Sequence, residues 1–444
     1  MQPPSANADR NKPLEYIHEQ FYSVIDEPSS SPLYDLALCY AVYFASLVSL
    51  DGAEARAILG RDKASQLLDL KLGLEQSLSQ ADFLNKPNVV GLQALAIYLS
   101  ALRVHNRGKG LWILNGFAIR IAQSLGLHRN GELLGLSPFL SEVRRRLWWN
   151  LVTRDSRSSE DYGLDQTTTL GRDVDIPLNV DDAQLSPDLK SLPPEKAGWT
   201  AMTFSLVQID LALARQELGS AAGSSSNPLP GEEIRIQIIN KAKASIIQRI
   251  EHCNAVVPCQ RMTSTCSLHL LNKFDFFSRQ QWLALQNRRC LENIATEDSL
   301  VQALEILEPQ LLADNDLLSP FRWAKRAFPQ YDITMYVLWH LCVKPEGSHV
   351  DRAWRIVDEV FAAEHSDSLV GGVGSKGAVL ASLRAKAMAL RKGTTTPVPQ
   401  DGGVDLPNSF ELEVDNFNFD IMANEWLART PWGQYIPFTP SVAL

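Results

Sequence analysis

The sequence predicts an all-α protein, a regulatory domain of several packed helices. Its long apolar stretches repeat at the three- and four-residue spacing of a helix rather than at the two-residue spacing of a strand. Proline and glycine stand mainly at the ends of these stretches, where helices begin or end. With 444 residues, 45% of them hydrophobic and 21% charged, the chain has a globular composition and is long enough to bury a large core.

The first strong helix is expected over residues 111–125. Its apolar stripe comprises Leu111, Leu114, Ala118, Ile121, Ala122 and Leu125. Because Ile113, Phe117 and Ile119 make the other sides apolar as well, we expect this helix to be buried. Gly126 follows where a left-handed residue closes a helix, and Leu127 supplies the apolar contact typical of such an ending.

A second helix is expected to begin at Ser137 and Pro138, since Ser caps free amides and Pro has the φ of a first helical turn. Its stripe comprises Leu140, Val143, Leu147 and Leu151, with Trp148 and Val152 beside it. A third helix is expected over residues 202–218. Residues 173–194 are rich in Asp and Pro without a helical stripe, so we expect a long loop there.

These elements divide the chain into segments. We expect a polar segment at 1–32, an all-helical domain at 33–393, a linker at 394–409 and a tail at 410–444. The small, polar stretch 219–231 is the best internal boundary, and it could equally be a loop between helices.

Composition also limits where the chain works. The uncharged runs 36–50 and 87–102 are shorter than the ~18 to 20 residues of a membrane span, so buried helices explain them better. Residues 1–12 lack the apolar stretch of a secretory signal. Six scattered cysteines fit reduced thiols in a core. We therefore expect an intracellular protein that does not enter membranes.

Catalytic motifs are sparse, and we expect no enzyme, no catalytic residues and no cofactor. His18 and Glu19 lack the second His of a zinc-protease helix, and no Gly-x-Ser-x-Gly elbow occurs. Residues 372–377 match GxGxxG, but helix-like sequence precedes them and no acid follows about 20 positions on, so they are typical of an interhelical turn. The neighbouring pairs Glu160-Asp161 and Asp181-Asp182 are interpreted as solvated charges, because adjacency does not converge two carboxylates on a substrate.

One stretch is rich in metal-binding residue types. It contains His252, Cys253, Cys259, Cys266 and His269. Only Cys266 and His269 have the local spacing that structural zinc sites use, and apolar neighbours favour buried free cysteines. We therefore expect no metal site.

The basic run Arg144-Arg145-Arg146 is too short for a typical phosphate-binding patch. Glu142 lies three and four positions before Arg145 and Arg146, so ion pairs within the helix layer are expected instead of DNA contacts. The DNA-binding residues, if the chain has any, stay unknown at this stage.

The carboxy-terminal tail differs from the rest of the chain. Residues 394–444 carry seven acids and one base, which accounts for −6 of the net charge of −9. Acids alternate there with a set of apolar residues, the candidate partner-binding residues Phe410, Leu412, Phe417, Phe419, Ile421, Met422 and Trp426. Such alternation keeps aromatic side chains available to a partner, as in acidic activation segments. The alternative is a terminal peptide that docks on its own domain through Trp426 and Trp432.

Several motifs, taken in order, resemble the middle homology region of fungal-specific transcription factors. They are His105–Trp112, Arg120–Arg129, Glu142–Trp149, Asp173–Asp182 and Gly198–Thr200. The resemblance is strong over about residues 35 to 218 and weak elsewhere. It implies an all-helical regulatory domain found in nuclear transcription regulators.

The resembled family usually carries a six-cysteine binuclear zinc cluster upstream of this region. Residues 1–104 contain only Cys39, so no DNA-contacting positions of that cluster can be transferred to this chain. The resemblance implies a nuclear regulator of a metabolic or biosynthetic pathway, including secondary metabolism. Its partners would be other regulators or the transcription machinery, with DNA reached indirectly and a homo- or heterodimer allowed. An accessory or scaffold protein of such a pathway, located in the cytoplasm, and an enzyme on a recruited helical fold remain the alternatives.

Overall fold

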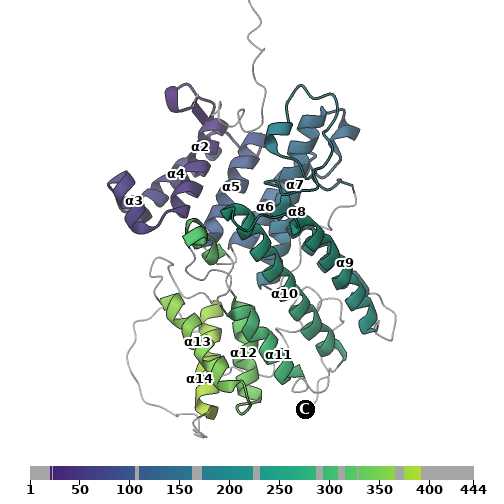
Figure 1. The fold of residues 1–444 in the computed structure, drawn as a ribbon. Coiled ribbons are helices and arrows are strands. Elements are labelled where there is room, and N and C mark those ends of the chain that lie inside the picture. Colours follow the sequence, from purple (N-terminus) through teal and green to yellow (C-terminus); the bar gives the residue numbers. More distant parts are fainter. Residues whose placement is uncertain are drawn as a thin grey trace, which may run out of the picture.

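The computed structural model describes residues 21–22, 24–105, 110–162, 173–223, 231–286, 294–308, 316–327, 330–365 and 375–391. Within these residues the secondary structure is helical throughout, with no strand, so the predicted all-α class is confirmed (Figure 1). No helix among them is long and apolar enough to cross a bilayer.

The elements follow one another as helices joined by short turns and one long loop. They are α2 (Leu33–Ser49), α3 (Gly52–Leu59), α4 (Lys63–Gln80), α5 (Val89–His105), α6 (Gly110–Ser124), η1 (Gly131–Leu134), α7 (Pro138–Tyr162), η2 (Asp182–Gln184), α8 (Thr203–Gly223), α9 (Glu232–Ile250), α10 (Pro258–Gln286), α11 (Glu297–Leu307), η5 (Asp316–Ala327), α12 (Tyr331–Val343), α13 (Val350–His365) and α14 (Ser375–Arg391).

Local signals in the sequence explain several helix ends. The Asp51 side chain accepts hydrogen bonds from the amides of Ala53 and Glu54 at 2.8 Å each, and Glu54 bonds back to the Asp51 amide, which is a capping box at the start of α3. At the end of α6, Gly126 has φ of +75°. The Gly126 amide donates to Gln123 and the Leu127 amide to Ala122, both at 2.9 Å, which is the Schellman ending predicted from the sequence.

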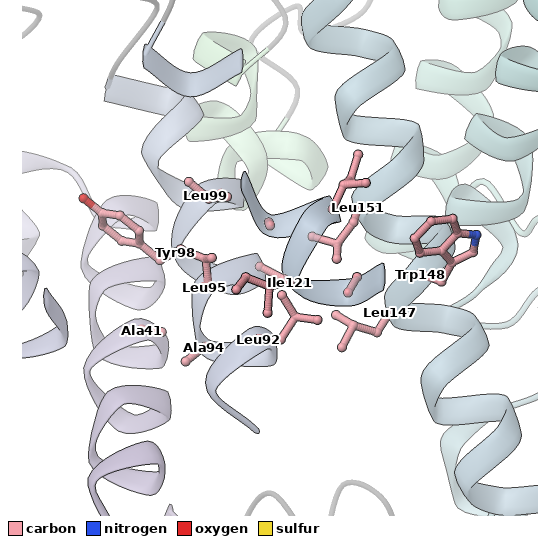
Figure 2. Packing of buried hydrophobic residues seen from close by; sticks show 14 of the residues in the cluster. Ala41, Leu92, Ala94, Leu95, Tyr98, Leu99, Ile121, Leu147, Trp148 and Leu151 are labelled. Atoms are coloured by element: carbon pink, nitrogen blue, oxygen red, sulfur yellow. The ribbon is translucent and has the colours of Figure 1, made fainter. Parts of the chain in front are cut away.

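The amino-terminal cluster is the largest apolar core and joins α2, α4, α5, α6, α7 and one face of α8. In Figure 2, Tyr98 of α5 extends toward α2, where its ring lies 5.0 Å from that of Phe44, while Leu92 lies on the side of Leu147 in α7. The uncharged runs 36–50 and 87–102 fall within α2 and α5, the central pair of this core. Their apolar character therefore serves helix packing.

Two long helices connect this core to the rest of the molecule. Leu206 and Ile209 of α8 belong to the amino-terminal cluster, whereas Val207 and Leu211 face a middle cluster built with α9 and α10. Phe276 and Phe277 of α10 enter a carboxy-terminal cluster with α11, α12, α13 and α14, which form the lower group in Figure 1. A helix that is apolar on two faces is needed wherever two cores meet.

The predicted helices over 111–125, 138–152 and 202–218 are confirmed as α6, α7 and α8, with two inward positions assigned wrongly. Ile113 is 60% exposed, because α6 packs on α5 and α7 and leaves a face to solvent. Leu140 is 46% exposed, because its neighbour Phe139 is the residue that packs on Val180 and Leu185.

Helix α8 also continues farther than the sequence suggested. Residues 219–223, part of the stretch expected to be a boundary or loop, are helical, and Ala221 packs against the middle cluster. The reason is that Ala is the best helix former and that this turn has a neighbouring helix to cover it. The proposed domain ranges themselves stay predictions, and the linker 394–409 and the tail 410–444 lie outside the described residues.

A carboxylate network and a cationic cavity

The arginine run at the start of α7 is held within the fold. Glu142 has 0% exposure, and its two carboxylate oxygens accept from Arg145 Nη1 and from Arg146 Nε at 3.0 Å each. The Leu178 amide also donates to Glu142 Oε1, at 3.1 Å. The predicted ion pairs of Glu142 with Arg145 and Arg146 are confirmed.

The same arginines bind the loop that precedes α8. Arg146 Nη1 lies 2.6 Å from Asp182 Oδ1, and the Trp149 indole donates to the Asp175 carbonyl oxygen at 2.8 Å. Asp181 pairs with Lys196. The interpretation of Asp181 and Asp182 as solvated charges is therefore wrong, because the loop folds back onto α7 and brings cations to both.

The remaining arginine of the run also has an internal partner. Arg144 donates to the Leu125 carbonyl oxygen at the carboxyl end of α6, and burial lowers the pKa of its guanidinium. A cation at a helix carboxyl end satisfies an unpaired carbonyl and the helix dipole. All three arginines thus tie α7 to α6 and to the loop. Glu160 and Asp161 lie in the last turn of α7.

A cavity of about 280 Å³ lies where α5, α6, α7, α8 and α10 meet, with Trp323 of η5 on its wall. It therefore sits at the junction of the amino-terminal and middle clusters, between helices far apart in the sequence. Its apolar walls come from residues such as Leu99, Leu111, Leu211 and Phe274.

The charged residues that line this cavity all have the same sign. They are Arg103 of α5, Arg154 and Arg157 of α7, Arg215 of α8 and Lys273 of α10. Among the described residues that form its lining, there is no Asp or Glu. A concave surface with five cations and no lining carboxylate attracts anions.

Each of three of these cations has a known neighbour. Arg154 Nη1 donates to the Ala96 carbonyl oxygen at 2.6 Å, and Arg215 Nη1 donates to Ser156 Oγ at 3.2 Å. Lys273 Nζ lies 3.7 Å from Asp332 Oδ2, a carboxylate outside the lining. Two of these partners are neutral, so they fix the side chains in place without cancelling their charge.

The pKa of Arg154 reports this excess of positive charge. Burial lowers it to about 9, and the charge of Arg103 lowers it further in the same direction. An anion placed among these groups would stabilise their charged forms, because an opposite charge nearby favours ionisation. Chemically, the cavity can therefore bind an anion, and it offers no nucleophile and base pair for catalysis among its described lining residues.

Sequence reasoning missed this cavity because its cations come from four helices. One signal was available, since Arg103 is the only Lys, Arg, Asp or Glu residue in the apolar sequence of α5. Arg154 and Arg157 also lie three positions apart on α7, which places them on one side of that helix. Neither signal by itself identifies a cavity.

The residues of the candidate metal stretch lie on α10 and in the turn before it. His252 and Cys253 lie in the turn, and Cys259, Cys266 and His269 lie on the helix. Burial raises the pKa of the Cys266 thiol to about 11 and lowers the pKa of His269 to about 4. No three His, Cys, Asp or Glu residues within the described part of the chain are grouped to hold a metal ion.

Two sequence features fall on residues that the structure does not describe. Gly372 and Gly374 of the GxGxxG match lie between α13 and α14, and Ser375 begins α14. The tail residues Phe410, Leu412, Phe417, Phe419, Ile421, Met422 and Trp426 all lie outside the described residues. The tail interpretation therefore stays a prediction.

Comparison with known proteins gives a consistent result. Residues 14–201, which include α2 to α7 and η2, match the fungal specific transcription factor domain. The chain is 28% identical to the aurofusarin cluster transcription factor of Gibberella zeae, over 80% of this chain and 53% of that protein. It is 28% identical to the pyriculol/pyriculariol biosynthesis cluster transcription factor 1 of Pyricularia oryzae, over 80% of this chain and 49% of that protein.

A third similar protein is the transcriptional regulator AacuB of Aspergillus aculeatus, which is 26% identical over 87% of this chain and 54% of that protein. The chain thus spans about half the length of the curated relatives it matches. These alignments cover more of the chain than the domain match does, so the similarity extends beyond residues 14–201.

Proposed function

We propose that this chain, whose residues 14–201 form a fungal specific transcription factor domain, is a transcriptional regulator of a fungal biosynthetic pathway and works in the nucleus. The observation that carries the proposal is the ordered similarity to regulators named for biosynthetic gene clusters, over 80% of the chain. The matched family is a transcription factor domain and not an enzyme family, which favours regulation over catalysis.

The fold supports action through protein partners. Arg144, Arg145 and Arg146, the basic run considered for DNA contact, are engaged with Leu125, Glu142 and Asp182 inside the protein. Phosphate contacts require arginines that are accessible to the nucleic acid backbone. We therefore infer that the helical domain reaches DNA through other regulators or the transcription machinery.

The tail is our candidate for the surface that binds such partners. Between Phe410 and Trp426 it has five acids, no base and seven apolar residues. Repulsion between acids opposes collapse of the apolar side chains and leaves them available to an apolar groove on a partner. Activation through this segment is part of the proposal.

Deleting the gene tests the regulatory role. The transcripts of one biosynthetic gene cluster should fall several-fold, and the full chain carrying a fluorescent label should accumulate in nuclei. Unchanged transcript levels together with cytoplasmic label would contradict regulation and favour the accessory or scaffold alternative.

A reporter assay tests the tail separately. The full chain is fused to a heterologous DNA-binding domain, and the seven apolar tail residues are replaced by Ala. We expect the reporter signal to fall several-fold at equal protein level, because the partner loses its apolar contacts. As a matched control, Thr394, Thr395 and Thr396 are changed to Ala, which should leave the signal unchanged. Equal signals from all fusions would show that the tail does not activate.

A further inference from the structure

We propose that the cavity between α5, α6, α7, α8 and α10 binds a small organic acid, with an apolar body and at least one carboxylate, as a ligand of this protein. The proposal goes beyond the regulatory function above. Ligand binding is measured on the purified chain, so its outcome does not depend on whether the chain regulates transcription.

Charge is the first argument for an anion. Five cations from four helices line about 280 Å³, and no described lining residue is acidic. The Arg103 charge acts unfavourably on Arg154, which is the electrostatic signature of cations placed close together. Keeping like charges together in a partly buried space is unfavourable, and a bound anion removes that cost.

The kind of cation favours a carboxylate group. Four of the five are arginines, whose planar guanidinium groups match carboxylate and phosphate oxygens in a two-pronged geometry. Arg154 and Arg215 are already held by Ala96 and Ser156, so their positions are set before a ligand enters. Pre-organised donors lower the entropic cost of binding.

Size and wall chemistry narrow the class further. The cavity has room for roughly nine waters at about 30 Å³ each, and lies just below the ~300 to 1,000 Å³ typical of ligand pockets. Leu111, Leu211, Phe274 and Trp323 form apolar wall that a bare inorganic anion would leave in contact with water. A small hydrocarbon or aromatic acid satisfies both the cations and this wall.

The position of the cavity gives such a ligand a structural consequence. Arg103 and Arg154 belong to helices of the amino-terminal cluster, whereas Lys273 belongs to α10, which packs in the middle and carboxy-terminal clusters. One anion that contacts all three would link these parts of the molecule electrostatically. Binding should therefore stabilise the whole chain against unfolding.

Thermal unfolding of the purified full chain tests the proposal. The probes are benzoate, 2-oxoglutarate and citrate, with inorganic phosphate and benzamide as comparisons, all at the same ionic strength set with KCl. We expect at least one carboxylate to raise the unfolding midpoint by about 5 °C in a saturable manner, while benzamide and KCl have no effect. The proposal is overturned if no carboxylate raises the midpoint, or if phosphate does so equally well.

Variants locate the binding site. Arg103→Gln and Arg154→Gln should each weaken carboxylate binding at least tenfold, because each removes a cation from the lining. Arg352→Gln is the matched control, since Arg352 pairs with Glu308 at 2.7 Å between α13 and the end of α11, outside the cavity lining. Should Arg154→Gln fail to fold, Arg103→Gln decides alone. Unchanged affinity in the variants that fold would place the ligand elsewhere and contradict the proposal.

Discussion

Glu142 shows how a charged residue becomes a structural residue. Its carboxylate is fully buried and accepts from Arg145, Arg146 and the Leu178 amide. Removing a carboxylate from water is costly, and it is tolerated only where the oxygens are fully hydrogen-bonded to charged partners. Arg145, itself only 4% exposed, depends on the same contact. Loss of either partner would leave the other charge buried and unpaired.

We predict that Glu142→Gln lowers the free energy of unfolding by about 3 kcal/mol, because two arginines lose their carboxylate while the side-chain shape is kept. Urea unfolding of the full chain measures this change. Glu132→Gln is the control, since the Glu132 carboxylate is 57% exposed and lies 3.8 Å from Arg145. Its effect should be below about 0.5 kcal/mol. Equal losses in the two variants would show that burial of Glu142 has no special weight.

At the scale of elements, the ending of α6 illustrates how a local signal sets direction. Gly126 adopts φ of +75°, and the amides of Gly126 and Leu127 close the last turn. The chain can then turn back so that α7 packs along α6. An added Cβ at Gly126 would meet its nearest atoms, in Arg144 and Leu134, only at 3.7 Å. Backbone conformation, and not space, is what requires glycine there.

We predict that Gly126→Ala lowers the free energy of unfolding by about 1 to 2 kcal/mol, the cost of a left-handed conformation for a residue with a Cβ. Gly110→Ala serves as the comparison, because Gly110 begins α6 with no heavy atom within 4 Å of the added Cβ. That variant should be as stable as the parent or slightly more so. Thermal or urea unfolding measures both, and a neutral Gly126→Ala would refute the backbone explanation.

At the scale of the whole molecule, charge and packing are separated along the chain. The helices share three apolar clusters joined through α8 and α10. Most of the net negative charge, −6 of −9, belongs instead to residues 394–444. The negative charge of the chain as a whole therefore says little about the helical part, whose cavity is lined by cations.

Limited trypsin digestion distinguishes an available tail from a docked one. The proposed activation segment predicts rapid cleavage after Arg429, well before cleavage after Arg145, which is buried within α7. Mass spectrometry of samples taken over time gives the order of cuts. If the Arg429 site survives as long as the Arg145 site, the tail is protected and the docked alternative through Trp426 and Trp432 is favoured.

The helices and several of their ends could be predicted because their causes are local. The stripe of α6, the start of α7 at Ser137 and Pro138, and the Gly126 ending all depend on residues within about one or two turns. The pairing of Glu142 with Arg145 and Arg146 was predictable for the same reason, since helical spacing alone brings them together.

Other features depend on which helices become neighbours. The sequence did not distinguish Phe139 from Leu140 as the buried residue, because that choice depends on where Val180 and Leu185 lie. The role of Asp182 and the convergence of cations from Arg103 to Lys273 follow from the folding of the loop onto α7 and from the meeting of five helices. The sequence by itself thus determined the helical class, the helix ends and the contacts within single helices. Only the tertiary structure decided the cavity and its charge, because electrostatic interactions act through space between residues that the order of the chain keeps apart.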